Sequence, residues 1–161
     1  MAEQITHTKN GKIEQFGRIC FYAGLLLELL IVILDKSSWI NPLEGQMFRV
    51  SFLLFACKLC VTKYSKKEWL AVLAAGVIAG LCYLSSDRDE AVRVVVFVAS
   101  MKGIDHKKAL RVVFYVTLTG MAVLAMLSLA GVLGEVWDAG AGYGIKEGSR
   151  RLCLGVGNSN A

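Results

Sequence analysis

The sequence predicts an all-α fold, a polytopic bundle of about five transmembrane helices. Its composition is 55% hydrophobic and only 19% charged, with one proline and a mean hydropathy of +0.54. Soluble domains usually carry about 45–50% apolar and about 25% charged residues. A chain of 161 residues is too small to bury such a surplus, because small domains bury proportionally less of their surface. These features exclude a disordered chain, a collagen-like repeat and an ordinary soluble domain, so we expect lipid to surround most of the surface.

Apolar runs of helical length account for the spans in chain order. A bilayer core about 30 Å thick requires roughly 20 apolar residues at 1.5 Å each. The charged residues of the first run are Arg18 and Glu28. The third run has no charged residue, and the fifth has only Arg111, close to its start. The second is shorter and contains Arg49 and Lys58, and the fourth is the shortest. The predicted spans are 16–34, 47–61, 69–84, 91–101 and 109–133.

The positions of the basic residues support a crossing by the short fourth run. Lysine and arginine concentrate on the cytoplasmic side of membrane proteins. They cluster before the first run, between the second and third, and between the fourth and fifth, whereas the other two connections hold a single lysine and a single arginine. With five spans every basic cluster lies inside, so the net charge of +5 indicates topology and not a nucleic-acid partner. We therefore expect a cytoplasmic leader over 1–15, a five-span bundle over 16–134 and a glycine-rich extracytoplasmic tail over 135–161.

Two spaced motifs have simple structural interpretations. Cys57-x-x-Cys60 has the spacing of a redox or metal pair, but no histidine or second cysteine pair completes such a site, so we interpret it as helix packing. Gly76-x-x-x-Gly80 fits a close contact between helices. Neither histidine has neighbours that would make it a general base. We assign no catalytic residue, metal or other cofactor.

Charges inside the spans are candidates for a site, because a charge at mid-bilayer costs a few kcal/mol or more unless it is paired or hydrated. Glu28 lies about 9 Å below the outer end of its span, and Arg49 and Arg93 lie about 3–5 Å below theirs. Lys58 lies near the inner end, so Glu28 can reach either arginine more easily than this lysine. Two arginines held by a buried carboxylate suit a phosphate or diphosphate group. Alternatively, both arginines only anchor their helices at the membrane interface.

The tail ends in SRRLCLGVGNSNA, and this ending carries a family resemblance. Residues 151–160 fit the form R-x-x-L-G-F-x-H-P-N at the arginine, the leucine, the glycine and the last asparagine. Val156, Asn158 and Ser159 stand where that form has phenylalanine, histidine and proline. The segment 64–70, with the sequence YSKKEWL, and the basic loop after the fourth run add to the resemblance. The chain resembles the amino-terminal part of a bacterial O-antigen polymerase or ligase-like membrane protein, of the kind found in Gram-positive polysaccharide clusters.

The resemblance implies an activity and a set of binding residues. Such proteins join glycan units carried on undecaprenyl diphosphate at the outer face of the cytoplasmic membrane, without a metal or a nucleotide. Arg151 would contact the diphosphate with help from Arg93 and Arg150, and Asn158 and Asn160 would hydrogen-bond to sugar or phosphate oxygens. The later spans and large outer loop of a complete polymerase do not follow within this sequence. We therefore expect a truncated polysaccharide polymerase that is inactive alone.

Two other classes of function remain to be weighed. A non-enzymatic membrane subunit or scaffold would use the same spans and bind other membrane or cell-envelope proteins through its tail. A small transporter would need polar residues along a path through several spans, which the uncharged third run disfavours.

Overall fold

The computed structural model describes residues 2–37, 41–86, 90–132, 137–138 and 151–152. Side chains are described from residue 11 to residue 132 within these ranges. The described chain is almost entirely helical, and two short strands pair antiparallel after the last helix. The elements are α1 (Ala2–Asp35), α2 (Glu44–Val61), α3 (Lys66–Ser86), α4 (Glu90–Ser100), α5 (His106–Leu129), β1 (Trp137–Asp138) and β2 (Arg151–Leu152).

Each of the five apolar runs forms a helix, as the sequence predicts. The first helix begins at Ala2, so it includes most of the segment expected as a cytoplasmic leader. Three helical segments are long and apolar enough to cross a membrane: Gly11–Asp35, α3 and α5. Helix α4 has 11 residues and is only about 16 Å long, roughly half of a bilayer core. A crossing by all five helices therefore stays a prediction.

Local capping explains where two of these helices begin or end. Before α3, Glu68 Oε2 accepts from the backbone N–H of Ser65 at 2.6 Å, and Ser65 Oγ accepts from the backbone N–H of Glu68 at 3.4 Å. This reciprocal pair is a capping box. After α5, Gly131 has a positive φ of 72°, and the backbone N–H of Val132 donates to the Leu127 carbonyl at 2.9 Å. These features form a Schellman stop, in which glycine adopts the left-handed conformation without strain.

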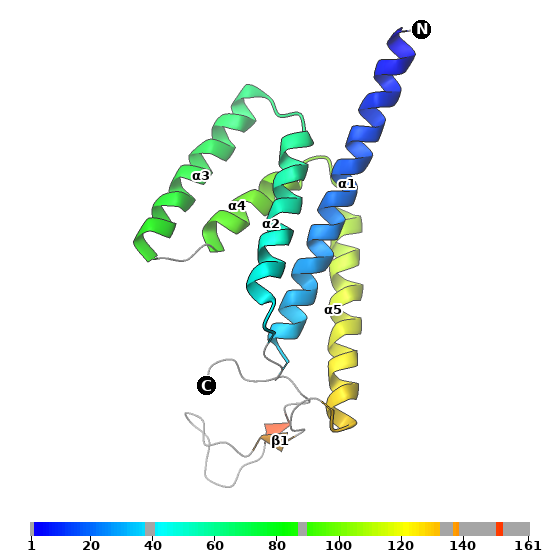
Figure 1. Ribbon diagram of the computed structural model, residues 1–161, viewed down its shortest axis with the longest axis vertical. Coiled ribbons are helices and arrows are strands. Elements are labelled where there is room, and N and C mark those ends of the chain that lie inside the picture. Colours follow the sequence, from blue (N-terminus) through cyan, green and yellow to red (C-terminus); the bar gives the residue numbers. More distant parts are fainter. Residues whose placement is uncertain (1, 38–40, 87–89, 133–136, 139–150, 153–161) are drawn as a thin grey trace.

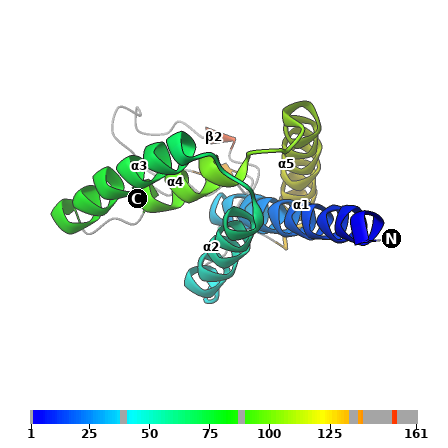
Figure 2. The ribbon, with the colours of Figure 1, turned by 90° about the horizontal axis from the view of Figure 1, so that it is seen from above.

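Helix α1 is the centre of the arrangement. Helices α2 and α5 both lie along α1, α4 packs against α2, and α3 packs against α4. Figure 2 shows α5 and α2 on opposite sides of α1, with the α3–α4 pair at the left of the view. Successive helices also alternate in direction (Figure 1). The beginnings of α2 and α4 therefore lie toward the same end of the bundle as the final turns of α1 and α3.

An aromatic cluster joins α1, α2 and α4. The ring centroids of Phe21, Phe55 and Phe97 lie 5.2 to 6.0 Å from one another. Helix α1 approaches α2 closely here, because a Cβ added at Gly24 would lie 3.0 Å from a ring carbon of Phe55. Edge-on and stacked aromatic pairs in this range stabilise a core beyond their buried area. The cluster fixes the three helices that form the first pocket described below.

Helices α3 and α5 expose their apolar side chains over most of their surface. Leu70, Val77 and Leu84 of α3 are 70%, 63% and 81% exposed, and Leu110 and Met126 of α5 are each 69% exposed. Contiguous apolar surface on this scale is unusual for a soluble monomer. Lipid is the environment that such a surface fits.

Candidate functional site

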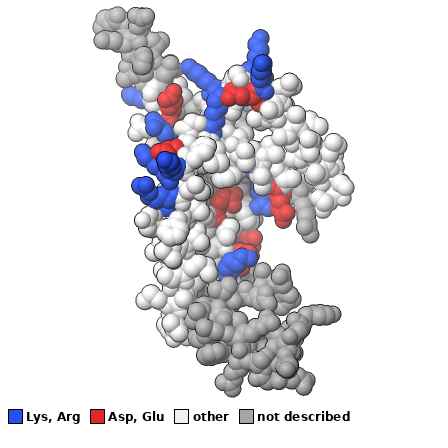
Figure 3. All heavy atoms as spheres, turned by 180° about the vertical axis from the view of Figure 1, so that it is seen from behind, with Lys and Arg blue, Asp and Glu red and all other residues white. Residues whose placement is uncertain are grey.

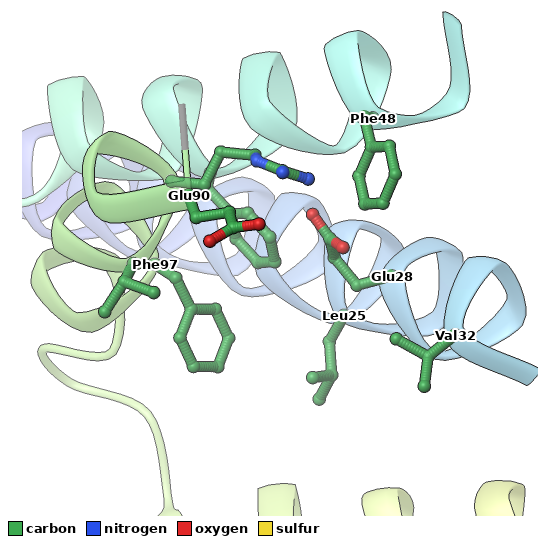
Figure 4. Close-up of a pocket in the computed structure, with 9 residues that line it drawn as sticks. Leu25, Glu28, Val32, Phe48, Glu90 and Phe97 are labelled. Atoms are coloured by element: carbon green, nitrogen blue, oxygen red, sulfur yellow. The ribbon is translucent and has the colours of Figure 1, made fainter. Parts of the chain in front are cut away.

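A pocket of about 370 Å³ lies where α1, α2 and α4 meet. Figure 4 shows the carboxylates of Glu28 and Glu90 directed toward one another across it, with the Phe48 ring beside Glu28. Arg93 also lines this pocket. The other walls are apolar and come from the same three helices: Leu25, Val32, Phe55, Val94 and Phe97.

Ser51 holds the carboxylate of Glu28 from the neighbouring helix. Its Oγ lies 2.7 Å from Glu28 Oε1 and 2.9 Å from the carbonyl oxygen of Phe48, so its single proton can be donated to either acceptor. Ser51 is fully buried, whereas Glu28 is half-buried on the pocket wall. A hydrogen bond to an ionised carboxylate is stronger than one between neutral groups. This contact fixes the acidic side of the pocket to both α1 and α2.

Arg93 borders both this pocket and a neighbouring one. Its Cζ lies 4.2 Å from the ring centroid of Phe48, in the position of a cation–π contact. The neighbouring pocket has a volume of about 780 Å³ and lies between α2, α3 and α4. Arg49 lines it together with Arg93. We call this second space the arginine pocket; its walls are completed by Gly45, Phe48, Phe52, Leu53, Tyr83 and Val92.

The structure groups Glu28 with the arginines and apart from Lys58. Glu28 shares a pocket with Arg93, and Arg49 lines the adjoining arginine pocket. Lys58 lies in a different pocket, lined by residues from the opposite ends of α1 and α2. Neither Ser51 nor Glu90 stands out from the sequence as a site residue. A lone serine in an apolar run shows no sign of which neighbour it faces, and Glu90 falls in the connection before the fourth apolar run.

The predicted binding residues of the tail fall largely beyond the described structure. Arg150, Asn158 and Asn160 lie outside the described residues. Arg151 belongs to β2, where its backbone stands opposite Asp138 of β1, and its side chain is not among those described. The structure therefore brings Arg93 to a pocket, and the binding roles expected for all five residues stay predictions.

The described cysteines are free thiols. Cys57 and Cys60 are both exposed on α2, whereas Cys20 is buried on α1. Within the described residues, no group of three or more His, Cys, Asp or Glu side chains is placed to hold a metal ion.

Two guanidinium groups on the wall of an apolar pocket can bind an amphipathic anion. Guanidinium matches the oxygens of a phosphate with paired hydrogen bonds, and aromatic and aliphatic walls suit an attached hydrocarbon. Glu28 and Glu90 share the first pocket with Arg93 and can orient its guanidinium by charge. No protein-family model, no curated protein and no solved structure matches the chain.

Proposed function

We propose that this chain is a multi-pass protein of the bacterial cytoplasmic membrane that binds the diphosphate of an undecaprenyl-linked glycan at its outer face, as the front part of a polysaccharide polymerase. The observation that carries the proposal is the arginine pocket, which combines Arg49 and Arg93 with apolar walls. In this interpretation the bound glycan would be presented to an acceptor for glycosyl transfer, and the tail would add Arg151 to the diphosphate contacts.

The proposed topology has five crossings with the amino end in the cytoplasm. The alternating helix directions in Figure 1 fit this arrangement, and the basic connections fall at one end. Figure 3 shows most lysine and arginine side chains toward the upper part of the molecule, away from the end of α5. Helix α4 would cross as a short helix, with α2 and α3 packed against it. The arginine pocket would then open near the outer surface, where Arg49 begins the second crossing and Arg93 the fourth.

Lipid binding by the purified chain tests this proposal. We expect undecaprenyl diphosphate to be retained in native mass spectra in preference to undecaprenol, which lacks the phosphates. Arg49→Gln and Arg93→Gln should each weaken retention about tenfold, equivalent to about 1.4 kcal/mol. Arg111→Gln is the matched control, because this exposed arginine lies at the opposite end of the molecule, in the first turns of α5. Equal retention of the two lipids, or equal loss in the control, would contradict the proposal.

A non-enzymatic subunit is the second candidate, and the open face of α3 favours it. A Cβ added at Gly76 or Gly80 would meet nothing within 4 Å, so neither glycine serves a contact within the described chain. Small residues at this spacing allow helices to approach closely in a membrane. If α3 binds a partner helix here, Gly80→Leu should release that partner, whereas Val77→Leu on the exposed surface beside it should not. Unchanged complexes of both variants after affinity purification would count against this candidate.

A further inference from the structure

A third pocket lies at the other end of the bundle and gathers basic side chains. Its volume is about 350 Å³, and it lies between α1, α2 and the turn that follows α4. We call it the basic pocket. Its charged lining consists of Glu14, Arg18, Lys58, Lys63 and Lys102.

Lys58 is the buried member of the basic pocket. The residue is only 6% exposed, and its Nζ donates to Thr62 Oγ1 at 2.8 Å. The Thr62 hydroxyl in turn donates to the Lys58 carbonyl at 2.7 Å, so its oxygen is oriented to accept from the ammonium. A Cβ added at Gly17 would lie 3.1 Å from Lys58 Cδ, which shows that glycine leaves room for the lysine stem. An ammonium has three donors, and the bond to Thr62 uses one of them.

The basic pocket carries an excess of positive charge. The positive charge of Lys102 is balanced from outside the pocket, because its Nζ forms a salt bridge of 2.5 Å with Glu68 Oε2. Within the lining, Glu14 is the acidic residue that opposes Arg18, Lys58 and Lys63. Buried positive charge costs free energy unless an anion or a hydrogen-bond acceptor compensates it. The pocket is therefore suited to an anion with several acceptor oxygens.

We propose that the basic pocket binds a phosphate group, carried by an anionic phospholipid headgroup or free in solution. Two apolar features favour the lipid. Ile13 and Val61 line the pocket itself, and the α1 surface beyond it exposes Phe16 and Ile19 at 55% and 59%. An acyl chain can follow this surface while its phosphate stays between the cations. Basic pockets between helices at the cytoplasmic side of membrane proteins bind lipid headgroups in this manner.

Binding to the detergent-purified full chain tests the basic pocket. Phosphatidylglycerol and phosphatidylcholine are compared by native mass spectrometry, and inorganic phosphate is added as a competitor. We expect retention of phosphatidylglycerol over phosphatidylcholine. Displacement of phosphatidylglycerol by millimolar inorganic phosphate would assign the site to free phosphate, and its persistence would assign the site to the lipid.

Substitutions decide whether the binding occurs at the basic pocket. Arg18→Gln and Lys58→Met should each weaken phosphatidylglycerol binding at least about tenfold, whereas Lys107→Gln, an exposed change at the same end, should not. Arg18→Gln should weaken this binding by the same factor when Arg49→Gln is already present, which separates this site from the arginine pocket. If Lys58→Met loses its helical circular dichroism, the exposed Arg18→Gln decides alone. Wild-type affinity in Arg18→Gln, or equal binding of the two lipids, would overturn the proposal.

Discussion

Ser51 of α2 and Glu28 of α1 are joined by a hydrogen bond of 2.7 Å between the serine Oγ and the carboxylate Oε1. The contact lies beside the pocket that Glu28 lines together with Phe48 and with Phe55 of the aromatic cluster. It is a polar link between two helices that also contact one another through the rings of Phe21 and Phe55. Such links count for more in a low-dielectric setting, where an unsatisfied polar group is costly.

Ser51→Ala should destabilise the α1–α2 pair. The substitution removes a hydrogen bond to a charged group, which contributes about 1.5–3 kcal/mol. We expect a loss of this size in the free energy of unfolding, measured by circular dichroism during denaturation in mixed micelles. Ser86→Ala is the control, because Ser86 is exposed and its Oγ donates to the Cys82 carbonyl one turn earlier in the same helix. Equal stability of the two variants would show that the interhelical bond contributes nothing.

Phe48→Leu should weaken anion binding at the arginine pocket without unfolding the protein. The leucine keeps apolar volume, but it removes the ring over which Arg93 lies at 4.2 Å. Cation–π contacts contribute about 0.5–1 kcal/mol at exposed sites. A loss of this energy corresponds to about a two- to fivefold loss of undecaprenyl diphosphate retention, which is the effect we expect. Leu53→Ala is the control, because it removes another apolar side chain from the lining of the same pocket. A larger loss of retention in Leu53→Ala than in Phe48→Leu would contradict a role for the ring.

The order of the helices along the chain could be predicted, but their arrangement in space could not. The length of an uninterrupted apolar run identifies a helix. The runs that form α3 and α5 are apolar on all sides, however, so they give little information about which face contacts a neighbouring helix. The central position of α1 depends on close approaches such as that of Gly24 to Phe55, which no periodicity indicates. Rise per residue converts position into depth, and it predicts that Glu28 reaches Arg49 or Arg93 more easily than Lys58. Of these two arginines, Arg93 shares a pocket with Glu28.

Gly24→Ala should destabilise the bundle although alanine is the better helix former. The added Cβ would lie 3.0 Å from a Phe55 ring carbon that the aromatic cluster holds in place, and such overpacking costs about 1–3 kcal/mol. The gain in helix propensity is about 1 kcal/mol, so the net change should be a loss. Gly76→Ala is the matched control, since its Cβ would meet nothing within 4 Å and only the gain remains. Thermal unfolding should therefore shift in opposite directions for the two alanines.

Tyr64 should make the stability of the α2–α4 junction sensitive to alkaline pH. Its Oη donates to the Ala99 carbonyl at 2.6 Å, and burial raises the pKa of the Tyr64 phenol above its ordinary value of about 10. The folded state therefore favours the neutral phenol, so the stability that it contributes is complete below about pH 10 and is lost as the pH rises through the raised pKa.

Tyr64→Phe tests this dependence directly. At pH 8 the substitution should lower the free energy of unfolding by about 1 kcal/mol, the contribution of one neutral hydrogen bond. The difference from the wild type should shrink above about pH 10, because the ionised phenol can no longer donate to Ala99. Tyr115→Phe is the control, since this ring is 59% exposed on α5. A difference between wild type and Tyr64→Phe that stays constant from pH 8 to pH 11 would show that ionisation of Tyr64 is not linked to folding.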